Sequence, residues 1–141
     1  MIAIDTNLLV YALDAQAPER SAARRAIEIA RSDPRGWGIA LPSIAEFWRV
    51  VTHPSAKTKA STPQAAIEFL RLLTEDGAAV WALSAASWDR LLRMAVALRV
   101  RGRRIYDLHI ALAALENGAT EIWTHDRNFQ SSPGLAVRDP L

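Results

Sequence analysis

The alternation of two kinds of segment is the feature of this sequence that most constrains its fold. Short apolar segments of strand length alternate with longer stretches in which apolar residues recur at helical spacing. Strands are predicted at residues 2–5, 37–41, 78–83, 121–124 and 135–137. Helices are predicted after a cap at Thr6 or Asn7, from Pro18 to about Ser32, from Ser43, from Pro63 to Gly77, over 84–100, and from about Ile105 to Asn117 and Gly118. This alternation favours an α/β fold, with helices on both faces of a central, mostly parallel sheet.

Length and composition restrict the class of protein. The chain has 141 residues, 50% of them apolar, so it is long enough to bury a core and fits one domain spanning 1–141. It contains no cysteine, which excludes disulfides, thiolate chemistry and cysteine-ligated zinc. No apolar run reaches the roughly 18 residues of a membrane-spanning helix, and no basic lead precedes the first apolar segment. A soluble, cytoplasmic protein without a membrane partner is therefore expected.

The choice of basic residue is uneven. The formal net charge is only +2, and Lys57 and Lys59 are the only lysines among 17 basic residues. Arginine makes forked contacts with phosphate, which favours a nucleic-acid partner. A GC-rich genome would produce the same bias, so both explanations stay open.

One acidic residue interrupts an apolar stretch near the start of the chain. Asp5 lies in "IAIDTNLLVYA", between segments that are apolar enough for burial. Burying an unpaired carboxylate costs several kcal/mol, so a cation, a cluster of donors or a cap must compensate it. The sequence should therefore contain the compensating feature.

Four acids are predicted at the edge of the sheet where the parallel strands end. Ligand sites of such sheets lie beyond the carboxyl ends of the strands. Each acid other than Asp5 has an ordinary alternative role, since Asp107 could complement a helix N-terminus, Asp126 could cap a turn and Glu46 could pair with Arg49. Together, the four would repel one another unless a multivalent cation lay among them. Carboxylates without cysteine or a histidine pair suit Mg²⁺ or Mn²⁺, which indicates phosphodiester hydrolysis with one or two ions.

Three stretches make the pattern recognisable. The segments "IDTNLLVYALD", "PSIAEFWRVVTH" and "RRIYDLHIALAALENGATEIWTHDRNF" occur in an order and at a spacing that resemble PIN-domain ribonucleases, in particular VapC-type toxins of bacterial toxin–antitoxin pairs. The resemblance runs from Met1 to about Leu141. It implies a single three-layer α/β/α PIN-like domain over 1–141.

The resemblance also implies roles for individual residues. The four metal-site positions of the family match Asp5, Glu46, Asp107 and Asp126, with Asp5 and Asp107 matching best. Thr6 and Asn7 fall where the family has polar residues that support the first Asp, and Thr124 matches the hydroxyl residue of its "T-x-D-x-x-F" stretch. Asn128 stands where many relatives have a further acid, so the sequence departs from the family there.

The activity that the resemblance implies is that of a metal-dependent endoribonuclease. Such enzymes use Mg²⁺ or Mn²⁺ to cut structured RNA, tRNA or rRNA. A cognate antitoxin protein, encoded by an adjacent gene, blocks them, and they usually form homodimers. By analogy, an antitoxin segment is expected on a surface of Leu8, Leu9, Tyr11 and the helix from Ser43 to His53.

Residues around the acids give further expectations. The basic run "RVRGRR" could be a solvated loop, but its position just before Asp107 favours binding of RNA phosphates by Arg99, Arg101, Arg103 and Arg104. The tryptophans occur in apolar contexts and are predicted in the core, not as base-stacking platforms: Trp37, Trp48, Trp81, Trp88 and Trp123.

Three other functions compete with this interpretation. A PIN-fold nuclease acting on DNA would have the same metal site, because the acids do not read the sugar. A phospho-accepting receiver-like signalling domain would need an acidic pair after the first strand and a late lysine, whereas here Thr6 and Asn7 follow Asp5 and no lysine follows Lys59. A nucleic-acid-binding module without catalysis would not need all four acids.

Overall fold

The computed structural model describes residues 1–54 and 61–141. Five strands form one sheet in the order β3-β2-β1-β4-β5, and every neighbouring pair is parallel. The strands are β1 (Ile2–Ile4), β2 (Trp37–Ala40), β3 (Ala79–Trp81), β4 (Glu121–Trp123) and β5 (Ala136–Arg138). The predicted α/β fold with a parallel sheet is therefore confirmed. Most of the loop predicted between Pro54 and Thr62 lies outside the described residues.

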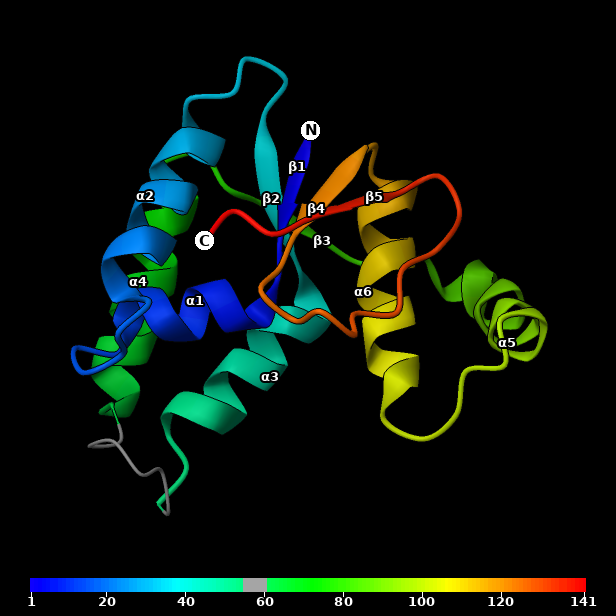
Figure 1. Cartoon of the computed structure of the whole chain (residues 1–141), viewed down its shortest axis with the longest axis horizontal. Coiled ribbons are helices and arrows are strands. Elements are labelled where there is room, and N and C mark those ends of the chain that lie inside the picture. Colours follow the sequence, from blue (N-terminus) through cyan, green and yellow to red (C-terminus); the bar gives the residue numbers. More distant parts are fainter. Residues whose placement is uncertain (55–60) are drawn as a thin grey trace.

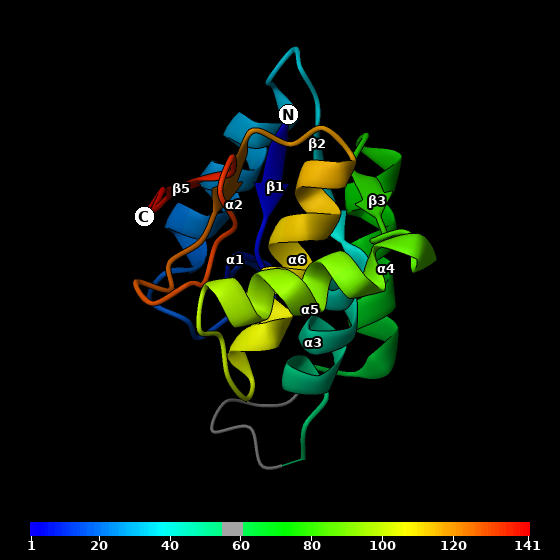
Figure 2. The same ribbon diagram turned by 90° about the vertical axis from the view of Figure 1, so that its right-hand side faces the viewer.

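Helices cover both faces of this sheet, as the two views show (Figure 1, Figure 2). On one side lie α1 (Thr6–Leu13), α2 (Arg20–Arg31) and α4 (Pro63–Glu75), and on the other lies α6 (Arg104–Glu116), with α5 (Trp88–Ala97) packed outside it. A short 3-10 turn, η1 (Ala85–Ser87), precedes α5, and α3 (Leu41–Val51) directly follows β2. In the described parts of the chain, no helix is both long and apolar enough to cross a membrane.

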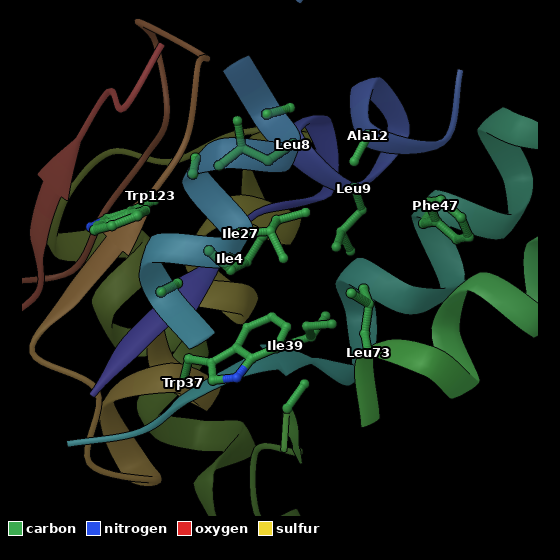
Figure 3. Close-up of a cluster of buried hydrophobic side chains, with 14 of the residues drawn as sticks. Ile4, Leu8, Leu9, Ala12, Ile27, Trp37, Ile39, Phe47, Leu73 and Trp123 are labelled. Atoms are coloured by element: carbon green, nitrogen blue, oxygen red, sulfur yellow. The ribbon is translucent and has the colours of Figure 1, made fainter. Parts of the chain in front are cut away.

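The central strand, β1, connects the cores on the two faces. Ile2 and Ile4 pack into the cluster beneath α1 and α2, while Ala3 points to the cluster beneath α6. Figure 3 shows Ile4 close to Ile27 and Ile39 in the first cluster. All three β1 residues are at most 2% exposed. Because β1 is paired on both edges and covered on both faces, the residue that follows it has a fixed position.

Two of the five tryptophan predictions are wrong. Trp37, Trp81 and Trp123 are buried, but Trp48 is 42% and Trp88 is 64% exposed. Both exposed rings lie on outward faces of helices, where apolar periodicity does not guarantee a covering neighbour. On α5 the exposed set is an i, i+4, i+8 row, since Leu92 and Val96 are also exposed.

The expectation of an antitoxin-binding surface that includes Leu8 and Leu9 is also wrong in part. Leu8 and Leu9 are fully buried in the core, so they cannot contact a partner, whereas Tyr11 is half-buried. The two leucines are buried because α1 packs between the sheet, α2 and α3, as Figure 3 shows around Leu9 and Phe47.

Candidate active site

Asp5 is compensated by uncharged donors. It follows β1 and is the N-cap of α1, so the predicted cap at Thr6 or Asn7 is wrong by a residue or two. Its Oδ1 accepts a hydrogen bond from the Thr6 backbone N–H at 2.7 Å. Its Oδ2 accepts from Asn7 Nδ2 at 2.8 Å and from Thr124 Oγ1 at 2.7 Å. A cluster of donors and a cap therefore hold this carboxylate, which is 5% exposed.

The environment of Asp5 still disfavours its charge. Burial is the largest cause and raises the pKa of Asp5 from 3.8 to about 6, and the negative charges of Asp107 and Glu46 add to the rise. The hydrogen bonds from Thr124 and Thr6 oppose it. At neutral pH the carboxylate is ionised at a cost in free energy, which a bound cation would relieve.

Glu46 lies on α3 and is connected to Asp5 through Thr6. The Thr6 hydroxyl donates to Glu46 Oε2 at 3.0 Å, while the backbone N–H of the same residue donates to Asp5. The i,i+3 pair with Arg49 is also present, with 3.7 Å between Arg49 Nη2 and Glu46 Oε1. Thr6 therefore connects the two acids by donating one hydrogen bond to each of them.

Asp107 and Asp126 are connected through an arginine. The Nη1 atom of Arg104 lies 3.0 Å from Asp107 Oδ2 and 3.2 Å from Asp126 Oδ2. Hydrogen bonds to the two carboxylates raise the pKa of the Arg104 guanidinium. The backbone N–H of Gln130 donates to Asp107 at 3.3 Å. The sequence predicted that Arg104 lies near the acids, but not that it lies between them.

Thr124 joins the two pairs of acids. Its hydroxyl donates to Asp5 and accepts from the side chain of Asn7 at 2.8 Å and from the backbone N–H of Asp126 at 3.0 Å. Asp126 also accepts from the backbone N–H of Asn128 at 2.8 Å, the turn-capping role considered for it. The side chain of Asn128 is exposed, and no acid is present at that position.

A groove of about 980 Å³ opens over these residues. Glu46, Asp107 and Asp126 line it, whereas the buried Asp5 is not among the lining residues. Of the four arginines predicted to bind RNA, Arg103 and Arg104 line the groove, and Arg99 and Arg101 are exposed outside its lining. The other lining residues are Leu41, Pro42, Ala45, Arg49, Ala82, Leu83, Tyr106, His109 and Ile110.

The sequence did not single out the apolar side of the groove. The side chains of Leu41 and Tyr106 both line the groove, and they are 51% and 61% exposed. The sequence could have indicated Tyr106, because this residue directly precedes Asp107 in the first turn of α6. An aromatic side chain in the first turn of a helix has few neighbouring helix residues to cover it. Burial lowers the pKa of His109, so its imidazole is neutral at physiological pH.

The donor set fits a hard divalent cation. Within residues 1–54 and 61–141, no three acidic or histidine side chains converge closely enough to form a complete ligand cluster. Mg²⁺ does not require one, since it keeps several waters and is usually bound through one or two carboxylates together with substrate phosphate. After burial, the charges of Asp107 and Glu46 are further causes of the raised pKa of Asp5. Both acids are therefore near enough to act electrostatically on Asp5.

Known proteins resemble this chain over nearly its whole length. A family model described as the PIN domain matches residues 2–134. Ribonuclease VapC43 of Mycobacterium tuberculosis is 32% identical over 142 residues, which cover 100% of this chain and 96% of the relative. Ribonuclease VapC48 of the same species is 28% identical, with 97% and 95% covered. Among solved structures, VapC20 of M. tuberculosis, a toxin that cleaves the sarcin-ricin loop, has a TM-score of 0.70 at 16% identity, with 92% of each chain covered. VapBC2 of Rickettsia felis, bound to a DNA fragment from its promoter, has a TM-score of 0.67 at 20% identity, with 98% of each chain covered.

Proposed function

Because this chain belongs to the PIN-domain family, among the VapC-type ribonuclease toxins, we propose that it is a metal-dependent endoribonuclease that hydrolyses structured RNA, tRNA or rRNA. The observation that carries this proposal is that Glu46, Asp107 and Asp126 line one groove together with arginines, while the charges of Asp107 and Glu46 act on the buried Asp5. We also infer that the whole chain, 1–141, forms one PIN domain. Pairing of β5, which lies beyond the matched residues, with β4 supports this.

Each acid has a role in this mechanism. Asp5 and Asp107 would hold Mg²⁺ or Mn²⁺, while Glu46 and Asp126 would complete the shell or orient the attacking water. When bound, the ion lowers the pKa of that water and stabilises charge on the phosphate and the leaving oxygen. The chain prepares the site through Thr6, Asn7 and Thr124, whose donors fix the Asp5 carboxylate, and Thr6 also orients Glu46.

The groove supplies the contacts to the RNA. Arg49 and Arg103 line it beside the acids and are placed to hold backbone phosphates. The exposed ring of Tyr106 offers a face on which an unpaired base can stack. Arg99 and Arg101 extend the positive charge beyond the groove, where they contact a longer RNA.

The proposal is tested by cleavage of a mixed tRNA and rRNA pool with the purified protein. Discrete fragments are expected in Mg²⁺ or Mn²⁺, and none with EDTA or with Asp107→Asn. Fragments that persist with EDTA would contradict the metal site, and equal cleavage by wild type and Asp107→Asn would contradict the assignment of Asp107.

Cleavage of DNA is the second candidate, because the acids contact phosphate and the sugar does not enter their chemistry. The same groove would accept single-stranded DNA. Digestion of RNA and of single-stranded DNA of the same sequence, side by side, distinguishes the two activities. Preferential cleavage of the DNA would overturn the RNA proposal. Membership of the PIN-domain family opposes the receiver-like alternative.

We further propose that a cognate antitoxin binds this protein and that the protein forms a homodimer. The solved VapBC2 complex of R. felis supports an antitoxin partner. The exposed row of Trp88, Leu92 and Val96 on α5 supports self-association, since a second copy would remove this apolar surface from water. Co-purification with the product of the neighbouring gene tests the first, and sedimentation of the isolated protein tests the second. A protein that sediments as a monomer at micromolar concentration would contradict the homodimer.

A further inference from the structure

We propose that Arg104 occupies the cation position between Asp107 and Asp126 in the metal-free protein, and that the divalent ion must displace it. This inference rests on the proposed function, because it takes the two acids as part of the metal site. It adds a regulatory contact within that site, made by a side chain of the same chain.

The contact geometry places one atom between the two acids. A single nitrogen, Nη1 of Arg104, lies within 3.2 Å of both carboxylates, and in each the nearest oxygen is Oδ2. A divalent ion that these oxygens ligate would lie about 2.1 Å from them. An ion bound to these two oxygens would lie in the space beside them that Nη1 fills, with its positive charge next to that of the guanidinium, so the ion and Arg104 compete for one position.

The surroundings allow Arg104 to leave. Its side chain is 32% exposed, and Arg104 is the first residue of α6, so the guanidinium can move into solvent without disturbing the core. In the described parts of the chain, its hydrogen bonds are those to Asp107 and Asp126. The two acids alone hold it, and a competing cation removes both of its attachments together.

The contact also explains how Asp107 and Asp126 can lie close together in the protein without a bound metal ion. Without a cation, Asp107 and Asp126 would repel each other across the groove, and the guanidinium neutralises that repulsion. Once displaced, Arg104 remains in the lining of the groove beside Arg103, where it can bind a phosphate. RNA that engages Arg104 therefore favours ion binding, and by linkage the ion favours RNA.

The experiment is a calorimetric titration of Mn²⁺ into the full chain. Wild type is compared with Arg104→Gln, which loses the charge, and with Arg103→Gln, a control that lines the same groove without contacting an acid. Loss of charge-assisted hydrogen bonds is expected to make Mn²⁺ bind about tenfold more tightly to Arg104→Gln. Arg103→Gln is expected to match wild type. Equal or weaker binding by Arg104→Gln would overturn the inference.

Two further variants keep the test decisive. Arg104→Lys preserves the charge, so its affinity for Mn²⁺ should stay near that of wild type even if Arg104→Gln folds poorly. Tighter binding by the lysine variant would contradict displacement of a charge. Asp107→Asn should lose Mn²⁺ binding in either Arg104 background.

The outcomes also separate this inference from the proposed function. If wild type and Arg104→Gln bind Mn²⁺ equally, only the role of Arg104 fails. If neither binds, the metal site itself fails, and the inference fails with it. If only Arg104→Gln binds, the guanidinium blocks the site in the way proposed.

Discussion

The two pairs of acids in the candidate site are held in different ways. Asp5 and Glu46 are connected through Thr6, with uncharged donors from Asn7 and Thr124 completing the shell of Asp5. Asp107 and Asp126 share one cation, Arg104. Asp5 is 5% exposed, whereas the side chains of Asp107 and Asp126 are 21% and 40% exposed.

We call Asp5 and Glu46 the fixed half of the site, because uncharged groups hold Asp5 in place. We call Asp107 and Asp126 the exchangeable half, because a bound ion could take the place of Arg104. Uncharged donors hold Asp5, and Arg49 lies 3.7 Å from Glu46 Oε1, so the geometry of the first half does not depend on one cation shared by its two acids. In the second half, one guanidinium offsets part of the negative charge of the two carboxylates, and a bound ion would have to replace that guanidinium. Variants in each half can test whether the two halves differ in this way.

Among the following variants, the largest effect is expected for a change of Asp5, in the fixed half. Asp5→Asn should reduce RNA cleavage roughly a thousandfold, because it removes several kcal/mol of metal-dependent stabilisation of the transition state. Circular dichroism should still report a folded protein, since the amide can keep part of the hydrogen bonding to Asn7 and Thr124. Cleavage within tenfold of wild type would show that Asp5 is not the fixed ligand.

The pH dependence of stability should follow from Asp5. Burial raises its pKa from 3.8 to about 6, so between these values the folded protein binds more protons than the unfolded chain. The free energy of unfolding in EDTA should therefore fall as pH rises from about 4 to 6, by about 3 kcal/mol in total. Urea titrations of wild type and Asp5→Asn isolate this contribution, because the variant lacks it. An identical pH dependence in both proteins would refute the cost assigned to this charge.

Removing the donor that joins the two halves should have a smaller effect. Thr124→Val deletes a buried hydroxyl that bonds Asp5, Asn7 and Asp126, so the free energy of unfolding should fall by about 2 kcal/mol. The pKa of Asp5 should rise further, because that hydrogen bond lowers it. Thr120→Val, at an exposed position, is the matched control. An equal loss of stability in both variants would mean that the hydroxyl network is not responsible.

In the exchangeable half, a change of Asp126 should be milder than a change of Asp5 or Asp107. Asp126→Asn leaves Asp5, Glu46 and Asp107 in place, so cleavage should fall only about tenfold, in the range of residues that orient a metal ligand or water. Mn²⁺ binding should weaken less than in Asp107→Asn. Loss of cleavage as complete as in Asp5→Asn would show that Asp126 is as necessary as Asp5 and does not only orient a ligand or water.

The smallest effect is expected on the apolar side of the groove. Tyr106→Ala should lower cleavage of single-stranded RNA about fivefold, because it removes a stacking face worth about 1 kcal/mol. Tyr106→Phe keeps that face and should match wild type. If both variants lose activity equally, the phenol hydroxyl matters and stacking does not.

The sequence predicted the scaffold better than the contacts. The alternation of segments located every strand within one or two residues, and the buried setting of Asp5 correctly required a compensating cluster. It did not reveal that β1 ends at Ile4, which leaves Asp5 as the cap of α1. The bridge from Arg104 to Asp126 spans 22 positions and depends on how α6 lies against β4, which periodicity does not encode. The exposure of Trp48 and Trp88 likewise depends on whether a neighbour covers a helix face.

The order of the strands also determines when the site comes into being. Asp5 and its partner Thr124 are 119 positions apart, and β1 lies between β2 and β4 in the sheet. During synthesis β1 leaves the ribosome long before the strand that brings Thr124 and Asp126 beside it. Contacts across such long loops form late, because loop closure costs chain entropy. A growing chain therefore has no assembled acidic site until β4 has been made, and its own topology keeps it inert through most of its synthesis.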